Sequence, residues 1–217
     1  MKQLSLLAIL AIFSVFTTAY AMTTTYDFKV SAANEAGYLA YVDNDLTITA
    51  SDGSGVNALG IATEGRYYAY LDGPSGNTGI GGLGVCTQAN AACAGMSDDN
   101  QVPGEYIHMR WDEVVDILSL NIQGDHQATI SGTNLHYSFD LGSNWHTQDV
   151  SGITLQDVML NSGNSVSKSL DYYISGAGAE MYVTAMTVSA VPVPSALWLF
   201  ATALIGFVGL GRRTSVA

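Results

Sequence analysis

The stretch Glu105-Tyr106-Ile107-His108-Met109-Arg110-Trp111 decides the fold class of this chain. Polar and apolar side chains alternate along it, and aromatic and β-branched residues contribute to the pattern. A period of two residues places successive side chains on opposite faces of a strand, so that one face is buried and the other meets solvent. The stretch therefore predicts a half-buried β-strand.

The same pattern recurs along most of the chain. It predicts further strands over Thr25–Val30, Leu46–Ala50, Arg66–Leu71, Val115–Ile122, Ala128–Ser131, Leu135–Leu141, Ile153–Leu160, Ser169–Ile174 and Met181–Val188. Turn residues separate these segments, and between Trp111 and Val115 we expect a tight loop or a helical turn. About ten short strands with no long amphipathic helix predict an antiparallel β-sandwich, with a jelly-roll as the first choice.

The segment from Asp72 to Pro103 lacks a regular pattern and contains many glycines and both cysteines, Cys86 and Cys93. A loop this long within a domain is usually functional or disordered. An even number of cysteines in an exported chain favours a disulfide, so we expect Cys86 and Cys93 to pair and close a small loop.

The best candidate site lies at the end of this segment, where Asp98, Asp99 and Asn100 precede Glu105. Hard cations such as calcium prefer carboxylate and amide oxygens, so the group predicts a calcium site, and an acidic turn facing water is the alternative. The turn Asp43-Asn44-Asp45 is a weaker candidate. No local signature of a catalytic residue occurs, and Gly79–Gly84 matches a dinucleotide fingerprint without the helix that such a site requires.

The two ends of the chain carry targeting signals. Lys2, an apolar run and the small-x-small pattern at Ala19-Tyr20-Ala21 predict a cleaved signal peptide over residues 1–21. At the other end, an apolar span from Ala196 to Leu210 is followed by Arg212 and Arg213. Its length is marginal for a membrane-spanning helix, and the arginines should remain on the cytoplasmic side.

The tail also contains Pro192, Val193 and Pro194, followed by Trp198 within the apolar span. In this order the motif, the span and the Arg212-Arg213 end resemble the PEP-CTERM sorting signal of Gram-negative bacteria. Val193 stands where a glutamate is usual. The resemblance covers residues 191–217 and implies processing by exosortase after a stage tethered to the inner membrane. An ordinary C-terminal anchor is the alternative. Residues 22–190 then form the folded domain.

Charge limits the partners of this domain. All 19 acidic residues lie between Met22 and Ala190, with only four basic residues, which gives this region a formal charge of −15. Such a field repels phosphate backbones and anionic lipid headgroups, so a nucleic-acid partner is excluded. Cations and neutral or cationic polymers fit it better, and a charge that serves only the solubility of the domain is the alternative.

The expected role is that of a structural or adhesive protein of the cell surface or extracellular matrix. The resemblance implies binding of exopolysaccharide in a biofilm, and the many aromatic residues can supply stacking surfaces for sugar rings or can simply fill the core. Two alternatives remain open: a secreted hydrolase of polysaccharides and a calcium-dependent adhesin that stays anchored in the membrane. We expect no cofactor other than structural calcium.

Overall fold

The computed structural model describes residues 22–30, 36–53, 67–73, 81–86, 100–125, 128–160 and 166–191. Within them, Thr23–Ala190 forms one compact unit made entirely of strands and loops. In this part of the chain there is no helix with the length and apolar character needed to cross a bilayer.

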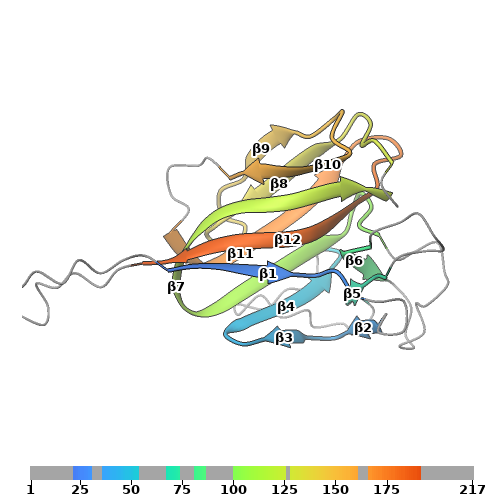
Figure 1. Ribbon diagram of the computed structural model, residues 1–217. Coiled ribbons are helices and arrows are strands. Elements are labelled where there is room, and N and C mark those ends of the chain that lie inside the picture. The colour runs from blue at the N-terminus through green and yellow to red at the C-terminus, as the bar shows by residue number, and fades with distance from the viewer. Residues whose placement is uncertain are drawn as a thin grey trace, which may run out of the picture. The chain divides into compact units, whose positions relative to one another are not determined.

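Twelve strands make up the described unit (Figure 1). They are β1 (Thr23–Asp27), β2 (Ala36–Tyr38), β3 (Tyr41–Asp43), β4 (Leu46–Ser51), β5 (Tyr68–Leu71), β6 (Leu83–Cys86), β7 (Tyr106–Gly124), β8 (Asn134–Ser138), β9 (His146–Asp149), β10 (Leu155–Met159), β11 (Val166–Ser175) and β12 (Met181–Ala190). Every pairing between them is antiparallel.

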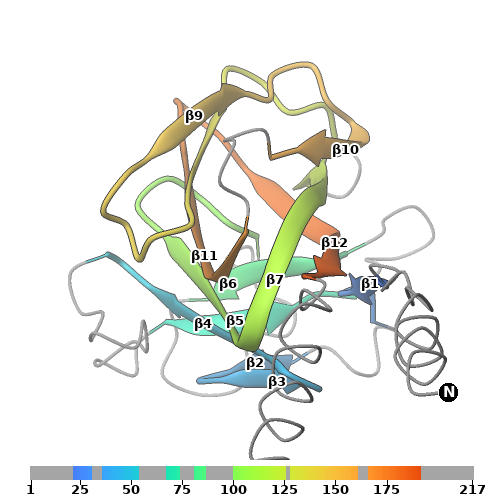
Figure 2. The same ribbon diagram turned by 90° about the vertical axis from the view of Figure 1, so that its left-hand side faces the viewer.

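The long strand β7 belongs to both layers of the structure (Figures 1 and 2). Its first part, Tyr106–Trp111, pairs with β4 on one side and with β11 on the other, which gives layer A the order β3-β4-β7-β11-β8-β9. Its second part pairs with β12 and β10, and β12 continues outward to β1 and to β6-β5-β2, which gives layer B. Three exposed residues, 112–114, separate the two parts.

One hydrophobic core lies between the two layers. Layer A contributes Ile48, Ile107 and Tyr172, and layer B contributes Leu120 and Val183, all with no exposed surface. Alternate residues of the same strands point away from this core, because successive side chains of a strand lie on opposite faces. The outward faces of the two layers therefore point away from each other, as in a β-sandwich.

The predicted all-β antiparallel sandwich is confirmed, while its jelly-roll variant stays a prediction. Two details were wrong. The predicted loop or helical turn after Trp111 is part of one continuous strand, β7, and the predicted strand Ala128–Ser131 is a connection without strand pairing. Short strands that the pattern did not indicate are β2, β3, β6 and β9.

Several predictions lie outside the described residues. These are the signal peptide with Ala19 and Ala21, the tail with Pro192, Val193, Pro194, Trp198, Arg212 and Arg213, and the residues Cys93, Asp98 and Asp99. Cys86 ends β6 in a buried position, and the described chain contains no free cysteine. The Cys86–Cys93 disulfide stays a prediction.

Candidate functional site: an aromatic platform on layer A

Strand register gathers aromatic side chains on the outward face of layer A. Tyr106 of β7 lies opposite Tyr173 of β11, and Tyr173 lies opposite His136 of β8. Neighbouring strands are about 4.8 Å apart, so this row extends about 10 Å across the sheet. Trp145, which immediately precedes β9, contacts the row from the side. We call Tyr106, His136, Trp145 and Tyr173 the aromatic platform.

The rings of the platform are in direct contact. The ring centroids of Tyr106 and Tyr173 are 4.6 Å apart, and His136 stacks on Tyr173 at 4.4 Å with an interplanar angle of 9°. The Trp145 indole stands nearly perpendicular to both tyrosines, at 6.0 Å from Tyr106 and 4.9 Å from Tyr173. Edge-to-face and offset contacts of this kind stabilise aromatic clusters beyond the burial of area.

A short loop between β8 and β9 holds Trp145 in place. Ser138 donates a hydrogen bond of 2.6 Å to the Asp140 carboxylate, which also accepts one of 2.8 Å from the backbone N–H of Asn144. These bonds favour the charged carboxylate and lower the pKa of Asp140 to about 2. Gly142 has a positive φ of 78°, and a Cβ there would lie 3.3 Å from Cζ2 of Trp145. The indole therefore packs over the backbone of this turn.

His136 supports the platform as a neutral ring. Its Nδ1 lies 2.9 Å from the hydroxyl of Thr147, and its Nε2 lies 2.7 Å from that of Ser175. A hydroxyl can donate or accept, so both nitrogens of a neutral imidazole are satisfied. Burial lowers the pKa of His136 from its usual value, because desolvation disfavours the charged form.

A buried polar network lies beside the platform on the same face. The hydroxyl of Ser51 is 2.7 Å from Nε2 of His108, and Nδ1 of His108 is 2.7 Å from Oδ1 of Asp171. Arg110 donates to the same Asp171 oxygen at 2.6 Å. The ring of His108 also lies parallel to that of Tyr106, with centroids 6.4 Å apart. The network thus connects β4, β7 and β11 next to the row of rings.

The order serine, histidine, aspartate matches that of a nucleophile, its base and an orienting acid. Burial argues against such a role, because Ser51 and His108 are only 3% and 4% exposed. The Ser51 oxygen also accepts the backbone N–H of Gly53 at 3.0 Å, and Arg110 already compensates the charge of Asp171. A side chain with these contacts holds strands together and has little surface left for a substrate.

The accessible part of the face is aromatic. Trp145 is 38% exposed, and Tyr106, Tyr173 and His136 are half-buried. The other prominent aromatic residues, Trp111 and Tyr172, are buried and belong to the core. A rigid surface that combines apolar rings with hydroxyls can contact a ligand that has both apolar and polar surface, as a sugar does.

The residues predicted to bind calcium are placed in part. Asn100 and Glu105 are both 4% exposed, and the Glu105 carboxylate accepts the backbone N–H of Val102 at 2.9 Å. Oδ1 of Asn100 is buried without a hydrogen bond to any described residue. Within the described ranges, no three histidine, cysteine, aspartate or glutamate side chains are grouped closely enough to hold a metal ion. The weaker candidate, Asp43-Asn44-Asp45, forms the β3–β4 turn, where Asp45 accepts a hydrogen bond of 2.6 Å from Tyr26.

No protein-family model and no curated protein matches the chain. Among solved structures, CpGH89CBM32-5 from Clostridium perfringens, in complex with GalNAc-β-1,3-galactose, is similar with a TM-score of 0.29 and 15% sequence identity. The match covers 70% of this chain and 99% of that one. A family 32 CBM from C. perfringens NanJ, in complex with galactose, has a TM-score of 0.29 and 10% identity over 72% of this chain and 99% of its own.

Proposed function

We propose that this protein is an exported carbohydrate-binding β-sandwich that attaches to polysaccharide at the cell surface or in the extracellular matrix. The observation that carries the proposal is the aromatic platform, which presents Trp145 to solvent in edge-to-face contact with Tyr106 and Tyr173. The role is binding and adhesion, because the Ser51–His108–Asp171 network, whose order is that of a catalytic relay, is buried and internally satisfied.

The geometry of the platform suits a sugar chain. Aromatic rings lose little conformational entropy on binding, because packing already fixes them, and this lowers the cost of association. The hydroxyls of Tyr106 and Tyr173 supply polar groups at the edge of an apolar surface. The strongly negative domain repels anionic polymers, so a neutral polysaccharide is the expected ligand.

Substitution of Trp145 tests the proposal. Loss of a central aromatic anchor typically costs about 2 kcal/mol or more of binding free energy, which corresponds to a rise in Kd of about 30-fold. We therefore expect Trp145→Ala to lose most of its retardation in affinity electrophoresis through gels that contain a soluble neutral β-glucan, galactomannan or xyloglucan.

Val42→Ala provides the matched control. Val42 is 63% exposed on β3, far along layer A from the platform, so its truncation removes exposed apolar surface without touching the rings. The control should migrate like the unmodified protein. Equal retardation of Trp145→Ala and the unmodified protein in every gel, with unchanged melting curves, rules out the platform as the binding surface.

For delivery, we propose that the signal peptide directs export and that residues 191–217 act as a PEP-CTERM-like sorting signal processed by exosortase. The order of Pro192, Pro194, Trp198 and Arg212-Arg213 supports this route. A chain truncated after Ala190 keeps the whole described sandwich, so it should fold but fail to remain at the cell surface. Normal surface retention of the truncated chain, measured by fractionation, contradicts the route.

A further inference from the structure

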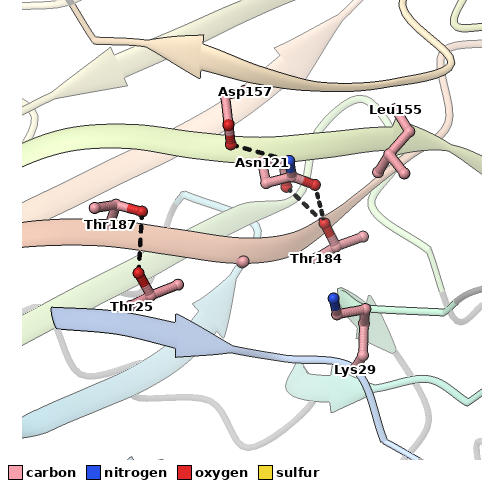
Figure 3. Close-up of a pocket in the computed structure, with 8 residues that line it drawn as sticks. Thr25, Lys29, Asn121, Leu155, Asp157, Thr184 and Thr187 are labelled. Atoms are coloured by element: carbon pink, nitrogen blue, oxygen red, sulfur yellow. Dashed lines mark hydrogen bonds between the residues drawn. The ribbon is translucent and has the colours of Figure 1, made fainter.

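A hollow lies on the outward face of layer B. It has a volume of about 330 Å³ and is formed by β1, β12, β7 and β10 (Figure 3). Its β1 side carries Thr25 and, just beyond that strand, Lys29, while its β10 side carries Leu155 and Asp157. We call this hollow the layer B groove.

A β-bulge builds the floor of the groove. The pairing of β12 with β7 shifts by one residue between Val183 and Ala185, which leaves Thr184 as the extra residue. Its hydroxyl donates to the backbone oxygen of Asn121 at 3.2 Å and is hydrogen-bonded to the Asn121 side chain. Bulges redirect side chains and occur often beside functional sites. Here the bulge fixes the Asn121 amide within the groove.

The walls of the groove combine apolar and polar groups. Asn121 donates from Nδ2 to Oδ1 of Asp157 at 2.9 Å, which leaves the second carboxylate oxygen of Asp157 as an acceptor. Lys29 supplies ammonium donors from the opposite side, and its charge is partly balanced by Asp27 at 3.4 Å. Leu155 is 47% exposed and adds an apolar surface.

These groups match a neutral sugar chain better than a charged ligand. Sugar hydroxyls both donate and accept, so a carboxylate and an ammonium on opposite walls can each bond to them, and the C–H faces can contact Leu155. Lys29 is the basic group of the groove, and Asp157 and Asp27, the ion-pair partner of Lys29, are the acidic groups, so their charges nearly cancel and favour neither an anion nor a cation. Pockets that bind small ligands likewise combine an apolar lining with a few placed polar groups.

The groove and the aromatic platform lie on outward faces that point in opposite directions, because the core lies between layers A and B. We propose that the layer B groove is a second carbohydrate site, which makes each molecule bivalent and able to join two polysaccharide chains. This inference rests on the function proposed for the platform. Two sites on one rigid sandwich raise avidity and cross-link a polymer without any new contact.

The test counts binding sites on the full chain. The probe is a trisaccharide of whichever β-glucan, galactomannan or xyloglucan retards the protein most, and equilibrium dialysis gives the number bound. The groove variant is Lys29→Ala with Asp157→Ala. Thr187 of β12 also lines the groove, so Thr187→Lys blocks it by bulk. The matched control, Lys168→Ala with Glu180→Ala, removes one exposed base and one exposed acid elsewhere. The platform variant is Trp145→Ala.

We expect the unmodified chain and the control to bind two trisaccharides each. The groove variants and the platform variant should each bind one, and a chain with both sites altered should bind none. With the intact polymer, light scattering should rise for the unmodified protein and stay low for each single-site variant. If the unmodified chain binds one trisaccharide and Trp145→Ala abolishes that binding, the groove is not a carbohydrate site, while the proposal for the platform is supported. If the groove variants lose a site while Trp145→Ala has no effect on binding, the proposal that the platform binds carbohydrate is wrong instead.

Discussion

Replacing Asp171 with alanine should severely destabilise the sandwich. The Asp171 carboxylate is 3% exposed and accepts hydrogen bonds from His108 at 2.7 Å and from Arg110 at 2.6 Å. Removing one partner of a buried charged pair typically costs about 3–5 kcal/mol, because the remaining charge keeps its desolvation penalty. The Arg110 side chain is 17% exposed, so the lower end of this range applies here. Two charge-assisted bonds of about 1.5–3 kcal/mol each give the same range.

Urea unfolding followed by tryptophan fluorescence measures this loss. For a domain of this size, 1 kcal/mol corresponds to about 2–4 °C in Tm, so Asp171→Ala should also lower the melting temperature by about 10 °C. Asp171→Asn keeps an acceptor oxygen and should lose less. A coupling energy of about 0.5–3 kcal/mol is expected in a double-mutant cycle with His108→Ala. A loss below about 1 kcal/mol for Asp171→Ala refutes the idea that this network holds β4, β7 and β11 together.

Two further predictions concern pH and calcium. The pKa of His136 is lower in the folded protein than in the unfolded chain, so the unfolded chain binds a proton at a higher pH than the folded protein does. The free energy of unfolding should therefore fall as pH drops below about 6.5 and level off below the folded pKa. Urea titrations should show this slope in the unmodified protein and a flatter one in His136→Gln. If the group around Asn100 and Glu105 binds calcium, added calcium should raise Tm, and Asn100→Ala should remove that rise. An identical melting curve with calcium or with chelator ends the calcium hypothesis.

The alternating pattern predicted most strands because a half-buried strand must alternate its side chains. It failed where that demand is weak. β9, with the sequence His146-Thr147-Gln148-Asp149, is a polar edge strand that buries little, and β2 and β3 are only three residues long. The pattern also predicted two strands where the structure has only β7, because the side chains of residues 112–114 leave the core while the backbone stays extended.

The platform could be predicted only in part. The sequence shows that Tyr106, His136, Trp145 and Tyr173 are present and that three of them lie in or beside alternating segments. It does not give the register that brings Tyr106 opposite Tyr173, because those residues are far apart in the chain and any even shift of register keeps the same faces buried. For the same reason, no local signature indicated the Ser51–His108–Asp171 network.

The position of β12 determines how the domain responds to mechanical force. β12 ends at Ala190, and it pairs antiparallel with β7 along nearly its whole length and with β1 over its second half, Ala185–Ser189. The inter-strand hydrogen bonds run perpendicular to the strands. If a polymer bound at Trp145, as proposed, resists a pull at Ala190 along the strand axis, the pull loads many of these bonds in shear at once instead of peeling them apart one by one. We therefore expect the domain to withstand tension in that direction.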